Sequence, residues 1–154
     1  MCLVLMVLNL SSRDTMKNLY DIAPAFSFVL NKGLVLGSVD YKPDEFGNTF
    51  LVMLGVSFSL RFERDRGQVF VDIGSDEVGW YKLEYILEFI DCSVRHQIGE
   101  PPDPSVLATV LQVHWEKVMD LFADHQKILT FQVFAKQKSA AFLNKIFHKG
   151  CDSN

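Results

Sequence analysis

Cysteine is scarce in this sequence, and its scarcity excludes one whole class of architecture. The 154 residues contain three cysteines, Cys2, Cys92 and Cys151, and no two of them form a C-x-x-C pair. An odd and widely spaced set cannot build the paired framework of a small disulfide-stabilised domain. We therefore expect a fold held together without disulfides, in a reducing compartment such as the cytoplasm.

Long apolar runs are also missing. The apolar run at the N-terminus extends from Cys2 to Leu8, well short of the about 20 residues that cross a bilayer. No basic stretch precedes it and no A-x-A-like site follows it, as a signal peptide would require. We expect no membrane association. Residues 1–15 are expected either to form a short core strand or helix or to precede a translation start at Met16, so function is sought elsewhere.

Positive charge is in short supply. Lys and Arg number 15 against 19 Asp and Glu, which gives a net charge of -4. A general nucleic-acid binder needs a basic surface to displace counterions from phosphates. The composition therefore predicts that nucleic acid is not the partner.

The short motifs of catalysis and cofactor binding are absent from the sequence. There is no G-x-S-x-G, no H-E-x-x-H and no GK[ST], and the stretch GLVLG (33–37) lacks the third glycine of a dinucleotide fingerprint. Cys92 and His96 are four residues apart, but zinc needs three or four ligands. We predict no metal site and no cofactor.

What the chain does contain is enough apolar material for one core. Apolar residues make up 49% of the sequence, 13 of them phenylalanines, and charged residues make up 22%. These proportions are ordinary for a folded globular protein. At this length they predict a single domain, 1–154, with a substantial hydrophobic core.

Glycine and proline divide the first half into short elements. Residues 13–22 are predicted to form a helix that ends before Pro24, and residues 25–33 a second helix closed by Gly33. Strands are predicted at 34–41, 49–54, 56–63 and 68–73, with a turn at 42–48 and a bend at Gly55. The run TFLVML (49–54) is continuously apolar, so we expect this strand to be buried on both faces.

Residues 56–73 have the pattern of a β-hairpin with a charged tip. Apolar residues alternate with mostly polar ones on both arms: Phe58, Leu60 and Phe62, then Val69, Val71 and Ile73. Facing side chains share one side of a sheet, so the loop must contain an even number of residues. We predict a four-residue loop, Arg64–Gly67, with Phe62 opposite Val69. The same alternation gathers Ser59, Arg61, Phe70 and Asp72 on the other face.

The second half of the sequence has helical periodicity. Residues 82–91 are predicted to form a helix that buries leucines and isoleucines and points Glu84, Glu88 and Asp91 into solvent. Asp103 followed by Pro104 marks the start of a helix to about residue 122. Residues 126–148 follow as one long helix, with a strand over Leu129–Val133 as the alternative. The fold class is α+β, an antiparallel meander of three to four strands in the first half packed against helices mostly from the second half.

Acidic residues concentrate just after the hairpin. Six acids and one base, Lys82, lie between Asp72 and Asp91, whereas five lysines and no acid lie between Lys127 and Lys149. If this is more than the solvent faces of two helices, the acidic face would attract a protein partner of basic character. Trp80 or Tyr81 would add an aromatic anchor. The residues predicted to bind the partner are Arg61, Phe70, Asp76, Glu77, Trp80, Tyr81, Glu84 and Glu88.

A second hypothesis assigns the acids to chemistry. Asp72, Asp76 and Glu77 would then converge to hold a divalent cation in a small metal-assisted hydrolase or nuclease. No Lys or His stands at a spacing that completes a known motif of that kind. The two hypotheses differ in geometry, because the enzyme requires these carboxylates to meet in a concave pocket.

The general organisation of the chain is similar to that of small bacterial immunity proteins, which neutralise toxins. The features shared are small size, acidic charge, an α+β pattern and no catalytic signature. The resemblance is one of class and brings no binding residues with it. It implies a non-enzymatic interaction protein, with an inhibitor of the immunity or antitoxin type as the example.

Overall fold

The computed structural model describes residues 19–42, 44, 48–98 and 101–148. The expectation for residues 1–15, the start of the helix predicted at 13–22, and most of the turn predicted at 42–48 lie outside these residues. Residues 19–22 are helical, and the helix ends before Pro24 as predicted.

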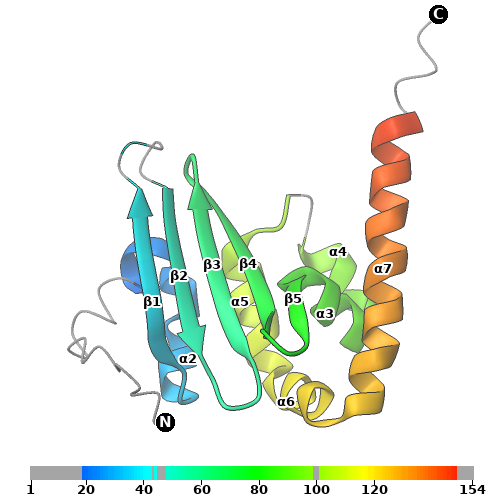
Figure 1. Ribbon diagram of the computed structural model, residues 1–154, viewed down its shortest axis with the longest axis horizontal. Helices are drawn as coiled ribbons and strands as arrows, with labels where there is room; N and C mark the ends of the chain where they lie inside the picture. The colour runs from blue at the N-terminus through cyan, green and yellow to red at the C-terminus, as the bar shows by residue number, and fades with distance from the viewer. Residues whose placement is uncertain (1–18, 43, 45–47, 99–100, 149–154) are drawn as a thin grey trace, which may run out of the picture.

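Five strands form one antiparallel sheet in the order of the chain, which confirms the predicted α+β meander (Figure 1). The strands are β1 (Val35–Lys42), β2 (Asn48–Leu54), β3 (Ser59–Asp65), β4 (Gln68–Ser75) and β5 (Gly79–Lys82). The fifth strand, β5, was not predicted from the sequence. Its four residues are too few to show an alternation, and it runs directly into the next helix.

The hairpin of β3 and β4 has a tighter turn than predicted. Phe62 lies opposite Val71, and Asp65 opposite Gln68, so the predicted pairing of Phe62 with Val69 and the four-residue loop are wrong. The two turn residues, Arg66 and Gly67, have φ of 49° and 83°. Positive φ at both positions is typical of the type I′ turn, whose twist matches that of the strands it joins. A shift of two residues preserves the parity, so the predicted faces are unchanged.

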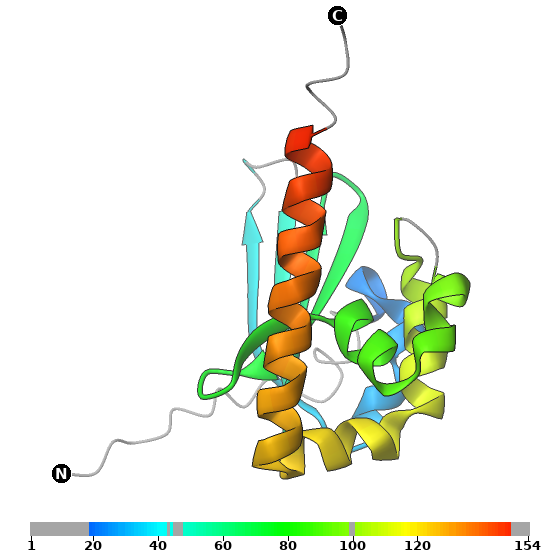
Figure 2. The ribbon, with the colours of Figure 1, turned by 90° about the vertical axis from the view of Figure 1, so that its right-hand side faces the viewer.

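Helices cover one face of the sheet (Figure 2). The alternate residues that point to this face are buried, among them Leu51, Leu60 and Ile73. Phe50 and Val52, which point to the other face of β2, are only half-buried. The expectation that β2 is buried on both faces is therefore wrong, because the helices of the described chain pack on one side only.

The helical layer follows the predicted segments with one break and one subdivision. Its α-helices are α2 (Phe28–Asn31), α3 (Leu83–Ile90), α4 (Arg95–Ile98), α5 (Pro104–Val113), α6 (Trp115–Ala123) and α7 (His125–His148), with 3-10 turns η1 (Pro24–Phe26) and η2 (Cys92–Val94). The segment predicted as one helix over 25–33 is divided into η1 and α2, and Gly33 closes it with φ of 87°.

The start of α5 is as predicted, since the Asp103 side chain accepts a hydrogen bond from the Ser105 amide at 2.7 Å. The predicted helix over 104–122 is interrupted at His114, where no glycine or proline signals a break. The change of direction sets Trp115 against Phe58, with ring centroids 5.2 Å apart. Tertiary packing of an aromatic residue thus overrides the local preference for a continuous helix.

The last helix, α7, is the long helix predicted for 126–148, and the strand alternative is wrong. Its buried residue Phe131 lies edge-on to Tyr81 and Phe89, with centroids 5.0 and 5.5 Å away. The C-terminal turns extend beyond the other helices (Figure 1). None of the helices in the described segments is long and apolar enough to cross a bilayer.

Candidate functional site

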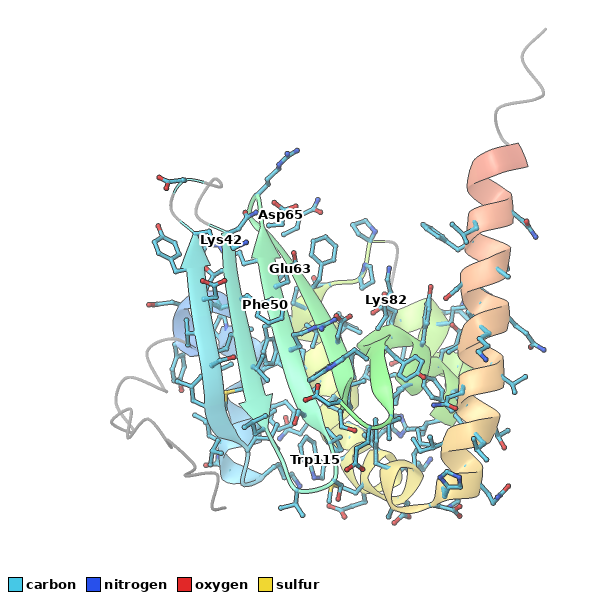
Figure 3. The ribbon with its side chains drawn as sticks, in the orientation of Figure 1. Lys42, Phe50, Glu63, Asp65, Lys82 and Trp115 are labelled. Atoms are coloured by element: carbon cyan, nitrogen blue, oxygen red, sulfur yellow. The ribbon has the colours of Figure 1, made fainter. Side chains whose placement is uncertain are left out.

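The alternation that sends Leu60 and Phe62 into the core sends the intervening side chains to the uncovered side of the sheet. We call this side the open face (Figure 3). The strand registers align its residues in rows across the sheet. One row consists of Asp40, Phe50, Glu63 and Phe70, and the next of Ser38, Val52, Arg61, Asp72 and Lys82.

Arg61 is the centre of the open face. It lies opposite Asp72, and its Nε and Nη2 donate hydrogen bonds to one carboxylate oxygen at 3.2 and 2.7 Å. The guanidinium carbon is also 4.7 Å from the centroid of the Trp80 ring and 5.5 Å from that of Phe50. Each cation–π contact contributes about 0.5–1 kcal/mol at such a partly exposed site, and the ion pair about as much at most. Together they hold the arginine in one orientation.

Trp80 reaches Arg61 because β5 approaches β4 very closely. Trp80 lies opposite Gly74. A Cβ atom added to Gly74 would be 2.0 Å from the carbonyl oxygen of Gly79, so no other residue fits there without displacing β5. Glycine at this position thus allows the β5 register that places the indole beside the guanidinium.

Apolar surface surrounds the Arg61 centre. Phe70 is 47% exposed and lies in the row next to Arg61. Leu54, at the end of β2, is exposed to a similar degree. Of the eight residues predicted to bind a partner, the fold therefore brings three onto this face: Arg61, Phe70 and Trp80.

Tyr81 lies on the other side of the sheet. Its ring packs on Phe131 in the core, and its hydroxyl donates a hydrogen bond to the carbonyl oxygen of Val78 at 3.2 Å. It is therefore not available on the open face as an aromatic anchor. The alternation of neighbours along β5 explains the difference, since Trp80 and Tyr81 must point to opposite faces.

The edge of β4 beyond β5 is not covered by a strand of the described chain. β5 pairs with β4 only from Asp72 to Ser75, while Gln68 to Val71 pair with β3 alone. A groove of about 320 Å³ runs along this edge, with Pro101 and Pro102 on its far side. Prolines lack the amide hydrogen that a β-ladder requires, so they flank the edge without pairing to it.

Glu84 and Glu88 do not form the solvated acidic face that the sequence analysis expected. Both are only partly exposed, and they line a cleft of about 770 Å³ between α3 and α7. Glu88 accepts a hydrogen bond from Lys138 and lies 3.9 Å from Arg95. The charge of Glu88 is therefore balanced within the molecule, because α7 packs on the side of α3 from which these glutamates project.

Burial raises the pKa of Glu84, and a backbone hydrogen bond and the nearby Lys82 ammonium lower it in part. Lys82 Nζ lies 4.0 Å from a Glu84 oxygen. No signal in the sequence indicated that Lys82, Arg95 and Lys138 line the cleft. Lys138 is 50 residues from Glu88, and periodicity gives no signal for a contact over that separation.

Asp76 and Glu77 are in the turn between β4 and β5, where the Ser75 hydroxyl accepts a hydrogen bond from the Val78 amide at 3.2 Å. Asp72, the third carboxylate of the metal hypothesis, is engaged by Arg61. Within the described ranges, no three His, Cys, Asp or Glu side chains gather closely enough to hold a metal ion. The geometry therefore offers the metal-assisted hydrolase no carboxylate cluster on which to build.

Comparisons of the chain with models of protein families, with curated proteins and with solved structures find no match. The chemistry of the surface is therefore the basis on which a function can be inferred.

Proposed function

We propose that this protein is a non-enzymatic interaction protein that binds a protein partner on its open face. The observation that carries the proposal is the set of aromatic and apolar side chains around Arg61 on the uncovered side of the sheet. Trp and Arg are enriched among the residues that dominate binding energy at protein interfaces. Here Trp80 and Arg61 are in contact at the centre of a face that no described helix covers.

The fixed geometry of Arg61 supports the same function. When a partner binds to a mobile arginine, the arginine side chain becomes ordered, and this costs about 0.5–1.5 kcal/mol for each immobilised side chain. The ion pair with Asp72 and the two flanking rings have already restricted Arg61. The free protein thus presents a preorganised polar centre with apolar residues beside it.

The charges of the open face define the chemistry of the partner. Arg61 and Asp72 neutralise each other. Lys82, in the same row, lies 4.0 Å from Glu84. Asp40 and Glu63 remain exposed on either side of Phe50. They favour a partner that places basic side chains on them and an apolar side chain near Phe70. The basic partner expected from the sequence is thus retained, but the acidic residues that would meet it are Asp40 and Glu63.

An inhibitor of the immunity or antitoxin type would use such a surface, since it has to bind another protein and needs no catalytic group. The resemblance of class noted in the sequence is consistent with this role. Such an inhibitor would hold its partner tightly enough for the two proteins to be isolated together.

The test is a pull-down from native lysate with identification by mass spectrometry, using the wild-type protein and two glutamate variants. Phe70→Glu places a charge in the apolar part of the open face. Val113→Glu makes the same change at a more exposed site on α5. We expect a partner that Val113→Glu retains and Phe70→Glu loses. A partner that Phe70→Glu captures as well as the wild type does would move the binding site away from the open face.

Charge reversal at Glu88 would not test partner binding cleanly. A lysine there would face Lys138 and Arg95, and the repulsion would perturb the packing of α7 on α3. Loss of partner binding would then report damage to the fold.

A further inference from the structure

The long helix α7 carries two apolar stripes on different sides. The inner stripe packs on the body of the protein through Ile128, Phe131 and Ala135, all buried. The outer stripe consists of Leu129, Val133, Lys136, Ala140 and Leu143. With about 100° of rotation per residue, the outer positions fall within about 40° of a single line along the helix, and the inner positions lie about 100–160° away from that line.

The outer stripe is exposed over about four turns of the helix. Leu129, Val133 and Leu143 are 42%, 58% and 50% exposed. Single apolar residues at the surface are common and need no explanation. Several of them on one side of a helix are different, because such patches mark interaction sites on proteins that otherwise keep polar surfaces.

The spacing of the outer stripe is that of a helix-pairing surface. Successive positions are separated by four, three, four and three residues, which is the a/d repeat of a heptad. The stripe spans about 21 Å of helix at 1.5 Å per residue. This length and spacing suit a second α-helix lying along α7.

Lys136 defines the charge of the helix that would bind. It lies in the middle of the stripe and, among the residues that the structure describes, has no acidic group within 4 Å. Between Lys127 and Lys149 the sequence has five lysines and no acid. Lys136 is also the midpoint of the stripe, so two copies of α7 paired along it would set one Lys136 beside the other, and this repulsion disfavours self-association. A single lysine at a core position instead selects a partner that supplies an acidic residue next to it.

The residues beside the stripe argue against a lipid surface as the occupant. Helices that lie on anionic membranes are rich in Lys and Arg on the polar face that adjoins the apolar one. The borders of the outer stripe are uncharged, with Gln126, Gln137, Ser139 and Asn144 in the flanking positions. Lys138 turns inward to Glu88, and Lys127 lies near Asp124.

We propose that the outer stripe of α7 is a second docking surface, which binds an amphipathic helix of another protein with acidic residues at the positions that flank Lys136. This surface is separate from the open face, and neither proposal depends on the other. The open face would take a partner surface with basic groups, whereas α7 would take an acidic helix.

The experiment uses a fluorescein-labelled synthetic helix of three heptads, with Leu at a and d and Glu at e and g. Its own glutamates keep it from pairing with itself. Binding to the full chain is measured by fluorescence anisotropy at low and high salt. A peptide with Lys at e and g is the control. We expect the Glu peptide to bind more weakly as salt increases, and the Lys peptide not to bind.

Variants of α7 test the site and the charge separately. Val133→Asp combined with Leu143→Asp should weaken binding of the Glu peptide about tenfold or more, as loss of a central interface residue does. Thr130→Asp combined with Ala141→Asp adds the same charge at exposed positions about 100–120° from the line of the stripe and should have a much smaller effect. Lys136→Glu should reduce affinity for the Glu peptide and create affinity for the Lys peptide.

Three results would overturn the proposal. The first is equal loss of binding in the two double-aspartate variants, which would show that the added negative charge weakens binding wherever it lies on α7. The second is a wild-type dimer in analytical ultracentrifugation that Val133→Asp with Leu143→Asp dissociates, which would make a second copy the occupant. The third is failure to bind the Glu peptide together with stripe-dependent sedimentation on phosphatidylserine vesicles, which would make a membrane the occupant.

Discussion

Replacement of Phe131 by alanine should be one of the most damaging single changes in α7. The ring is fully buried and meets Tyr81 of β5 and Phe89 of α3 edge-on. Three elements therefore converge on this one side chain, and a cavity remains when it is removed. Phe→Ala at a closed site of this kind destabilises a protein by about 3–5 kcal/mol.

That loss is a large share of the total stability, which for a typical domain is about 5–15 kcal/mol. For a domain of 154 residues, a change of 1 kcal/mol moves Tm by about 3 °C. We therefore expect Tm to fall by about 10–15 °C in Phe131→Ala.

The matched control is Val133→Ala, two residues along the same helix but in the outer stripe. Removing an exposed side chain should change the free energy of unfolding by less than about 0.5 kcal/mol. The higher helix propensity of alanine would offset part of any loss. Urea denaturation followed by the fluorescence of Trp80 and Trp115 measures both variants.

Equal losses in the two variants would refute the assignment of inner and outer sides to α7. A larger loss in Val133→Ala would show that the helix docks through Leu129 and Val133, and the proposed docking surface would then be part of the core. The comparison therefore checks the premise of the helix-pairing proposal by a measurement that involves no ligand.

Three further predictions concern the sheet and the cleft. Burial raises the pKa of Glu84 above its ordinary 4.5, so the wild-type protein loses stability as pH rises from 4 to 7, because the folded state holds a proton that the unfolded chain releases. Glu84→Gln should therefore become more stable relative to the wild type over this pH range, and a difference in unfolding free energy that is the same at pH 4 and pH 7 in urea denaturation would contradict this. Gly74→Ala should destabilise the protein by about 1–3 kcal/mol, since its Cβ would meet backbone atoms of β5. Gly37→Ala should cost less in the same assay, because the atoms nearest its Cβ belong to the Leu54 side chain, which can move aside. A double-mutant cycle of Arg61→Ala and Asp72→Asn should give a coupling of about 0.5–1 kcal/mol, because the pair is partly exposed; no coupling would mean that the ion pair does not hold Arg61.

The candidate site was accessible from the sequence only in part. The alternation along the hairpin predicted that Arg61, Phe70 and Asp72 share a face, and they do. Nothing in the pattern indicated that Trp80 would join them, because β5 is too short to show a period and its place depends on the close approach at Gly74. The concentration of acids in the sequence indicated Glu84 and Glu88, but it did not indicate that Lys138 pairs with Glu88.

By itself the sequence determined the local features of this protein: the fold class, the parity of the hairpin and the start of α5 at Asp103. These follow from alternation, capping and turn chemistry, which act within a few residues. Tertiary structure alone decided the hairpin register, the break at His114, the pairing of Glu88 with Lys138 and the side of α7 that packs inward. Loops of two and four residues give the hairpin the same parity, and either apolar stripe of α7 could pack inward. In both cases the local pattern allows two arrangements, and contacts between segments distant in the sequence determine which of them forms.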